Sequence, residues 1–247
     1  MTPRVIGSAA ALLIGNELLS GKVHEANLVE LARTLRALGI QLSRAVMVFD
    51  DIDVIAQETR SLAQSHDIVF TSGGVGPTHD DVTIEGISKG FGVKAVVDEK
   101  LKRLLSDAYG DKLTDGHLRM ALKPEGALLM EGSDVKWPTI VYENVWILPG
   151  VPEIFRMKLA VVREHLRGQE PFFSRAVFTN LDEATLKPLL DAIVSEHPRV
   201  DVGSYPKWFD ESYKTKVTFD SRKEDRVEAA LNAFVALLPP EAGARVE

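Results

Sequence analysis

The sequence predicts an α/β protein in which a three-layer domain with a parallel sheet precedes a small α+β domain. Apolar strand-like runs alternate with amphipathic helical segments from residue 8 to residue 71. This alternation is typical of parallel strands joined by right-handed crossovers. A stretch at residues 168–171 predicts a linker, and a second set of strands and helices begins after it. We therefore expect one domain over residues 1–168 and another over residues 172–247.

Each element of the first domain follows from hydrophobic periodicity. Residues 8–14 form a continuous apolar run that ends at Gly15, which predicts a buried strand. Leucines then recur at spacings of three and four residues up to Gly39, which predicts a helix with a glycine at its end. The later segments predict strands at 45–49, 68–71 and 145–148, helices at 52–62, 82–91, 99–109 and 153–166, and a helical turn at 114–121.

The second domain has its own pattern of strands and helices. It predicts strands at 175–179, 201–205 and 215–219 and helices at 186–194 and 224–238. A polar, aromatic loop at residues 206–212 contains Trp208 and Phe209. We expect these two rings to pack against the domain, the alternative being an anchor for an interface.

Composition excludes several classes of function. The chain has no cysteine, so disulfides, thiolate metal sites and cysteine nucleophiles are excluded. The net charge is −7 and no run of Lys and Arg exceeds two residues, which disfavours nucleic acid as a partner. No apolar run approaches the length of about 18 residues that a membrane span needs. We expect a cytoplasmic protein without a membrane or nucleic-acid partner.

The strongest local signal is the glycine loop, residues 71–81, which follows the third predicted strand. It places Gly73, Gly74 and Gly76 before a pair of acids, Asp80 and Asp81. Glycines let the backbone approach a ligand, and the N–H groups of such a loop form a concavity for an anion such as phosphate. The two acids could hold a divalent ion, or they could cap the helix that follows. The pattern is neither the P-loop nor the dinucleotide-binding Gly-x-Gly-x-x-Gly motif.

Other loops at strand ends are expected beside the glycine loop, because ligands bind outside the carboxyl ends of parallel strands. Glu17 and Asp50 follow the first two strands, and each also has a purely structural interpretation: a solvated loop acid for Glu17 and a helix cap for Asp50. The Pro149–Pro152 turn follows the fourth strand and is expected to contact substrate. Lys136 and Trp137 are predicted to lie near the ring of a ligand.

Four motifs in order resemble a known family. They are Gly15-Asn16-Glu17-Leu18-Leu19, Asn27, the glycine loop through Thr83, and Leu148-Pro149-Gly150-Val151-Pro152-Glu153. Together they resemble the molybdopterin-binding domain shared by molybdenum-cofactor biosynthesis proteins and competence/damage-inducible protein A. They are also similar to the amino-terminal domain of eukaryotic FAD synthases. The tail resembles the FAD-synthase type through Gly203-Ser204-Tyr205-Pro206 and Trp208.

The resemblance implies functional roles for Asp50 and Asp81. In pterin-adenylating relatives the domain transfers a nucleotide to a pterin phosphate, whereas other branches are associated with a pyrophosphatase activity on ADP-ribose or FAD. The resemblance also implies a homo-oligomer, a dimer or trimer.

Our leading hypothesis is a metal-dependent pyrophosphatase acting on FAD or ADP-ribose. Asp81 and Asp80 would hold Mg²⁺, Mn²⁺ or Co²⁺, and Asp50 would assist by orienting water. The residues predicted to bind the nucleotide or pterin substrate are Gly15, Asn16, Glu17, Ser72, Gly73, Gly74, Gly76, Pro77, Thr78, His79, Thr83, Pro149, Gly150 and Pro152. The alternatives are a molybdopterin-binding or adenylating protein and a regulatory module that binds a ligand without turnover.

Overall fold

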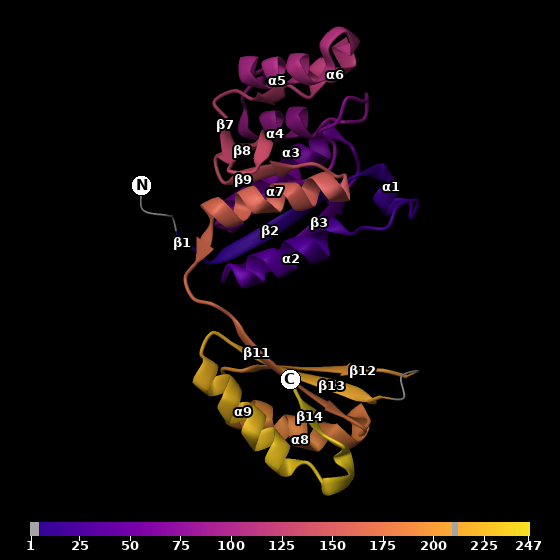
Figure 1. Ribbon diagram of the computed structural model, residues 1–247, viewed down its shortest axis with the longest axis vertical. Coiled ribbons are helices and arrows are strands. Elements are labelled where there is room, and N and C mark those ends of the chain that lie inside the picture. The colour runs from indigo at the N-terminus through magenta and orange to yellow at the C-terminus, as the bar shows by residue number, and fades with distance from the viewer. Residues whose placement is uncertain (1–4, 209–211) are drawn as a thin grey trace. The chain divides into compact units, whose positions relative to one another are not determined.

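The computed structural model describes residues 5–208 and 212–247, which divide into two compact units (Figure 1). One unit comprises Met1–Gln169 and the other Glu170–Glu247. No helix in the described residues combines the length and the apolar character that a membrane span requires.

A six-stranded sheet forms the centre of the first unit. Its order is β3 (Gln41–Val48), β2 (Ser8–Ile14), β4 (Ile68–Ser72), β9 (Val145–Leu148), β8 (Val135–Tyr142) and β7 (Leu128–Gly132). The first four strands run parallel, which confirms the α/β class. β7 and β8 add an antiparallel hairpin, so the sheet is mixed. The sequence did not predict this hairpin because Pro138 interrupts β8, at a point where the pairing with β7 shifts register.

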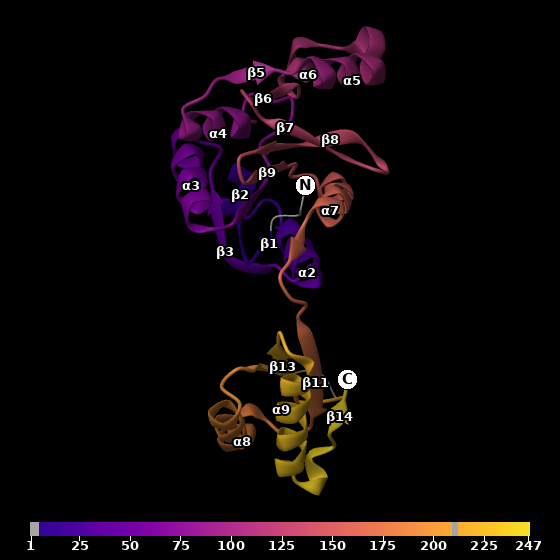
Figure 2. The ribbon, with the colours of Figure 1, turned by 90° about the vertical axis from the view of Figure 1, so that its left-hand side faces the viewer.

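Two pairs of helices cover the two faces of this sheet (Figure 2). α2 (Asn27–Ala37) and α7 (Pro152–His165) pack on one face, and α3 (Ile52–Ser65) and α4 (Thr83–Phe91) pack on the other. Each face encloses its own apolar core. The first contains Leu31, Leu35, Phe70, Phe155 and Leu159, and the second contains Leu12, Ile55, Leu62, Ile84 and Ile87. The three layers that the sequence predicts are therefore present.

Glycines allow α3 and α4 to pack closely. A Cβ added at Gly90 would lie 2.6 Å from the carbonyl oxygen of Ala56, and one at Gly86 would lie 2.6 Å from Cγ2 of Ile55. Both distances are far inside van der Waals contact, so neither position has room for a side chain. α4 begins at Thr83, two residues after the glycine loop, and this contact holds the helix against α3.

Gly90→Ala is expected to destabilise the protein by about 1–2 kcal/mol, because overpacking against backbone outweighs the gain of about 1 kcal/mol in helix propensity. Gly116→Ala is the matched control, since a Cβ at that helical glycine would meet nothing closer than 3.5 Å. Urea unfolding of both variants measures the difference. Equal midpoints for the two variants would contradict the close packing of α3 and α4.

The first unit carries further short elements. They are β1 (Val5–Ile6), paired with β10 (Arg167–Gly168), α1 (Asn16–Leu19), β5 (Ala95–Val97), paired with β6 (Leu122–Pro124), α5 (Glu99–Tyr109), the 3-10 turn η1 (Gly110–Lys112) and α6 (Asp115–Arg119). The helices at 99–109 and 114–121 were both expected, with small differences at their ends.

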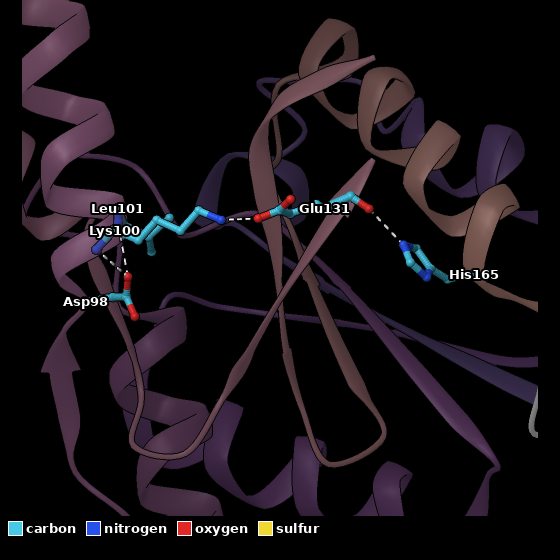
Figure 3. A network of polar contacts seen from close by, with 5 residues as sticks. All are labelled: Asp98, Lys100, Leu101, Glu131 and His165. Atoms are coloured by element: carbon cyan, nitrogen blue, oxygen red, sulfur yellow. Dashed lines mark hydrogen bonds and ion pairs between the residues drawn. The ribbon is translucent and has the colours of Figure 1, made fainter. Parts of the chain in front are cut away.

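A polar network ties α5 and α7 to β7 (Figure 3). Asp98 caps α5 by accepting hydrogen bonds from the backbone N–H groups of Lys100 and Leu101, at 2.9 and 3.1 Å. The Lys100 ammonium forms an ion pair with Glu131 on β7. The carbonyl oxygen of Glu131 lies 2.8 Å from Nε2 of His165 on α7. The hairpin is therefore held to two helices from different parts of the chain.

The second unit is a four-stranded antiparallel sheet with two helices. The sheet order is β12 (Asp201–Pro206), β13 (Thr215–Ser221), β11 (Phe173–Thr179) and β14 (Arg245–Val246). The helices are α8 (Glu183–Glu196) and α9 (Glu224–Leu237), followed by the 3-10 turn η2 (Pro240–Ala242). The expected packing of Trp208 is wrong, because 86% of its surface is exposed. Phe209 lies outside the described residues.

Candidate functional site

The carboxyl ends of four adjacent parallel strands meet at one edge of the large sheet. Gly15 follows β2, Asp50 follows β3, Gly73 follows β4 and Pro149 follows β9. The chain reverses direction across the sheet here, because β3 lies on one side of β2 and β4 on the other. Such a switch point is where open α/β sheets bind ligands. The loops that the sequence placed together are therefore neighbours in space.

Within the glycine loop, close packing requires each glycine to lack a side chain. Gly73 has a φ of +107°, and a Cβ there would lie 2.1 Å from the carbonyl oxygen of Ile14. Gly74 has a φ of +63°, and its Cβ would lie 2.2 Å from Oγ1 of Thr83. A Cβ at Gly76 would lie 2.7 Å from Oδ2 of Asp81. These glycines bring bare backbone to the surface of the site.

Buried side chains hold the shape of this loop. Thr83, fully buried at the start of α4, donates its hydroxyl to the carbonyl oxygen of Gly73 at 2.9 Å. Asn27 donates to Oγ of Ser72 at 2.9 Å and to the carbonyl oxygen of Gly150 at 2.7 Å. The geometry therefore makes Thr83 a brace for the loop, and its predicted contact with substrate stays a prediction.

Asp50 faces the site and does not cap a helix. Asp51 is the cap of α3, accepting hydrogen bonds from the backbone N–H groups of Asp53 and Val54 at 2.8 and 3.0 Å. Asp50 accepts a hydrogen bond at Oδ2 from the backbone N–H of Asn16 at 2.8 Å. The capping interpretation is therefore wrong for Asp50.

Burial raises the pKa of the Asp50 carboxyl above its ordinary value. The hydrogen bond from Asn16 opposes this shift, whereas the negative charges of Glu17, Asp80 and Asp81 add to it. Each of these three carboxylates is therefore close enough to Asp50 to repel its negative charge. Such a concentration of like charge costs folding energy, and it is typical of a site that binds a cation or moves a proton.

Asp81 organises the turn before α4. Its Oδ2 accepts hydrogen bonds from the backbone N–H of Thr78 at 2.9 Å and from the Thr78 hydroxyl at 2.5 Å. Its carbonyl oxygen accepts one from Nη2 of Arg119 at 2.9 Å. The residue before α4 is Val82, and no side chain caps that helix, so the acids do not serve as its caps. Asp80, Thr78 and His79 are exposed beside it.

A cavity of about 600 Å³ opens from the glycine loop. Gly74, Gly76 and Asp81 of the glycine loop line part of it, and Pro149 also contributes. The remaining wall is mainly apolar and comes from α4, α5, the α6 region, β8 and α7. It includes Ile84, Leu105, Tyr109, Met120, Leu122, Trp137, Pro138, Ile140, Ile154 and Met157. The cavity thus joins the glycine loop to an apolar pocket, and its volume is within the size range of small-molecule sites.

The residues predicted to contact a ligand lie in different positions relative to this cavity. Trp137 lines it, and its predicted contact with the ring of a ligand stays a prediction. Lys136 does not line this cavity. It lines a separate hollow, together with Lys100 and Glu131. Gly150 and Pro152 are absent from the wall of the main cavity. Pro152 occupies the first turn of α7, where its fixed φ suits a helix start.

Comparison with known proteins identifies the first unit. Residues 10–167, more than half of the chain, match the family described as a probable molybdopterin binding domain. The chain belongs to this family. Residues 171–247 match the family described as the middle domain of FAD synthase. The resemblance inferred from the motifs is confirmed for both parts of the chain.

Individual relatives agree with this assignment. A protein from Archaeoglobus fulgidus is 31% identical, over 91% of this chain and 95% of its own length. The probable FAD synthase of Caenorhabditis briggsae is 27% identical over 96% of this chain, and this chain covers 51% of that enzyme. The crystal structure of the CinA protein from Thermoplasma acidophilum, whose function is unknown, superposes with a TM-score of 0.59. The two sequences are 32% identical, and the match covers 64% of this chain and 97% of that one.

Lys158 of the molybdopterin-binding domain lines the cavity, although the sequence did not single it out. Lys158 on α7 is only 4% exposed. Its ammonium donates hydrogen bonds to the carbonyl oxygens of Trp137 and Pro138, the latter at 2.8 Å. Burial lowers the pKa of Lys158 to about 8. The signal was present in the sequence, because Lys158 interrupts the apolar helix face formed by Phe155, Leu159 and Val162.

The free energy of unfolding should rise with pH between about 8 and 10.5 because of Lys158. In this window the unfolded chain keeps the lysine proton while the folded protein has released it, so raising the pH favours the folded state. The shift corresponds to at most about 3 kcal/mol. The measurement is urea unfolding of the wild type and Lys158→Met at pH 7 to 10.5. Parallel pH profiles would contradict a buried, charged lysine.

Proposed function

We propose that this protein is a metal-dependent pyrophosphatase that cleaves a dinucleotide substrate such as FAD or ADP-ribose. The observation that carries the proposal is the continuity of the site. The glycine loop and Asp81 line a mainly apolar cavity at the switch point of the sheet, and a Cβ added at Gly74 would lie 3.5 Å from Oδ1 of Asp50. A dinucleotide has a charged diphosphate joined to flat rings, which matches both halves of this site.

The diphosphate would bind to the backbone of the glycine loop. The N–H groups of Gly74, Val75 and Gly76 donate to no protein acceptor in the described residues. Consecutive N–H groups of this kind form an anion-binding concavity, and their dipoles cost no reorganisation when charge develops on the phosphate oxygens. The loop would therefore stabilise the diphosphate both before and during cleavage.

The acids fit a divalent cation that arrives with the substrate. Among the described residues no group of three His, Cys, Asp or Glu side chains has the arrangement of a metal cage. Magnesium is commonly held by one or two carboxylates together with substrate phosphates and water, so a full protein cage is not required. In the described residues, the side chains of Asp50 and Asp81 each accept hydrogen bonds at Oδ2, which leaves Oδ1 for this purpose. Bound Mg²⁺, Mn²⁺ or Co²⁺ would neutralise phosphate oxygens, with Asp80 beside it.

Asp50 would hold the attacking water. Its raised pKa makes it a better proton acceptor than an ordinary aspartate, and Asn16 fixes its orientation. Water would attack the phosphorus of the AMP half and give its proton to Asp50. The bond from that phosphorus to the bridging oxygen breaks, and the oxygen leaves with the second phosphate. FAD and water thus give AMP and FMN, whereas ADP-ribose gives AMP and ribose phosphate.

A panel of nucleotides tests this proposal. The full chain is incubated with FAD, ADP-ribose, NAD and ATP in the presence of Mg²⁺, Mn²⁺ or Co²⁺, and AMP is measured by chromatography. We expect AMP from FAD or ADP-ribose, and none from the Asp81→Asn variant. Asn retains an oxygen that accepts from Thr78, so this variant keeps the turn. Absence of cleavage with every substrate and metal would overturn the proposal.

A second candidate function is binding or adenylation of molybdopterin at the same site. The description of the family that matches residues 10–167 favours it. The same panel discriminates the two, because adenylation consumes ATP only when a pterin phosphate is supplied. Tight binding without turnover of either substrate would instead support a regulatory module.

A further inference from the structure

The main cavity holds a positive charge that the proposed cleavage chemistry does not use. Lys158 lines the cavity, together with Trp137, Pro138 and Met157. In the described residues it forms no ion pair with a carboxylate, and its two hydrogen bonds go to neutral backbone carbonyls. A buried ammonium without a counter-charge is costly, which marks it as a candidate for ligand recognition.

Arg119, the other cation in the wall of the cavity, has a carboxylate partner. Arg119 is paired with Glu85 at 2.9 Å and donates to the carbonyl oxygen of Asp81. Asp81 belongs to the glycine loop, and the remaining titratable group in the wall is Tyr109. Lys158 is therefore the cation of this wall that lacks a carboxylate partner in the described structure.

The geometry of Lys158 restricts what it can recognise. An ammonium has three N–H donors and no acceptor. Two donors are used on Trp137 and Pro138, which leaves one for a ligand, and the acceptors nearby are consumed by the same bonds. A matching ligand edge therefore presents an acceptor. A carbonyl oxygen offers two lone pairs to this N–H, whereas each acceptor nitrogen of adenine offers one.

The surrounding wall selects a flat ring. Trp137 and Tyr109 offer aromatic surface, and Leu105, Met120 and Met157 offer apolar and adaptable surface. We propose that the apolar end of the cavity takes a heteroaromatic ring with a carbonyl oxygen, and that Lys158 donates its third N–H to that oxygen. This inference rests on the proposed function and narrows it. FAD carries such a ring on the half that does not become AMP, whereas ADP-ribose has only adenine.

Equilibrium binding tests this assignment separately from catalysis. FAD and ADP-ribose are titrated calorimetrically into the full chain with EDTA present, so that no metal supports turnover. For Lys158→Met the Kd of FAD should rise about tenfold to a hundredfold, as expected for a lost hydrogen bond from a charged donor. The Kd of ADP-ribose should stay within about twofold, because both proteins bind the diphosphate alike.

A measurement on the wild type covers the case in which Lys158→Met does not fold. The affinity for FAD should fall between pH 7 and pH 9 as Lys158 loses its proton, relative to the affinity for ADP-ribose over the same range. Equal losses for both ligands, or no binding of FAD by the wild type, would overturn the inference. Binding that depends on Lys158 without any cleavage would support it while removing the proposed pyrophosphatase. If FAD is cleaved but its affinity does not change in Lys158→Met, the pyrophosphatase proposal stands and the role of Lys158 is overturned.

Discussion

Asp50→Asn is expected to lower kcat for FAD or ADP-ribose by about 10²–10⁴-fold, the range attributed to a general base. Asn has nearly the same shape as Asp, and its oxygen still accepts the hydrogen bond from the backbone N–H of Asn16. What it loses is the ability to take a proton from water. The loss should therefore appear in kcat more than in KM.

The same substitution should leave the protein as stable as the wild type or make it more stable. The folded-state pKa of Asp50 is raised, so the folded protein bears a penalty for its charge above that pKa, and acidification relieves the penalty. Removing the charge removes the penalty at pH 7. Asp53→Asn is the matched control, because Asp53 is an exposed acid on α3 that pairs with Lys89. A fall in activity with a matching loss of thermal stability would contradict the role of Asp50 in catalysis.

Gly73→Ala is expected to have the largest effect on stability, about 3 kcal/mol or more. The new Cβ would lie 2.1 Å from the carbonyl oxygen of Ile14, and the φ of +107° is strained for any residue with a side chain. Strands β2 and β4 would have to separate at the point where the loop begins. Activity should be lost with stability, because the loop amides would move.

Gly21→Ala separates strain from steric overlap. Gly21 also has a positive φ, +70°, but a Cβ there would meet nothing within 4 Å. It should cost only the conformational strain, about 1–2 kcal/mol. Urea unfolding of the two variants measures the difference. If Gly73→Ala were no worse than Gly21→Ala, the close contact between β2 and the glycine loop would be wrong.

The parts of the fold that sequence predicted best are those with clear periodicity. The apolar run at residues 8–14 and the leucine face before Gly39 correspond to β2 and α2. The β7–β8 hairpin was missed because its apolar residues do not alternate regularly and Pro138 suggests a break. Local patterns identify single elements, whereas pairing in this hairpin depends on long-range packing against β9.

Some residues of the candidate site were predictable from the sequence, and others were not. The glycine loop was recognisable because three glycines followed by two acids exceed what an ordinary turn needs. The strand order then brings Asp50, which follows β3, beside this loop. The structural roles of Thr83 and Asp51 were not predictable, because Ser, Thr and Asp serve equally as caps, braces and ligands. The break that Lys158 makes in the apolar face of α7 was visible in the sequence, but its hydrogen-bond partners on β8 were not, because the sequence did not predict that strand.

The central claim is that the diphosphate and its metal bind at the glycine loop, and a crystal structure of a complex tests it most directly. The full chain would be crystallised with Mn²⁺ and a non-hydrolysable methylene analogue of ADP-ribose, and the metal located by its anomalous scattering. The account predicts phosphate oxygens within hydrogen-bond distance of the N–H groups of Gly74 and Gly76, with manganese in contact with Asp50 or Asp81. An analogue or metal bound elsewhere on the protein would contradict the account.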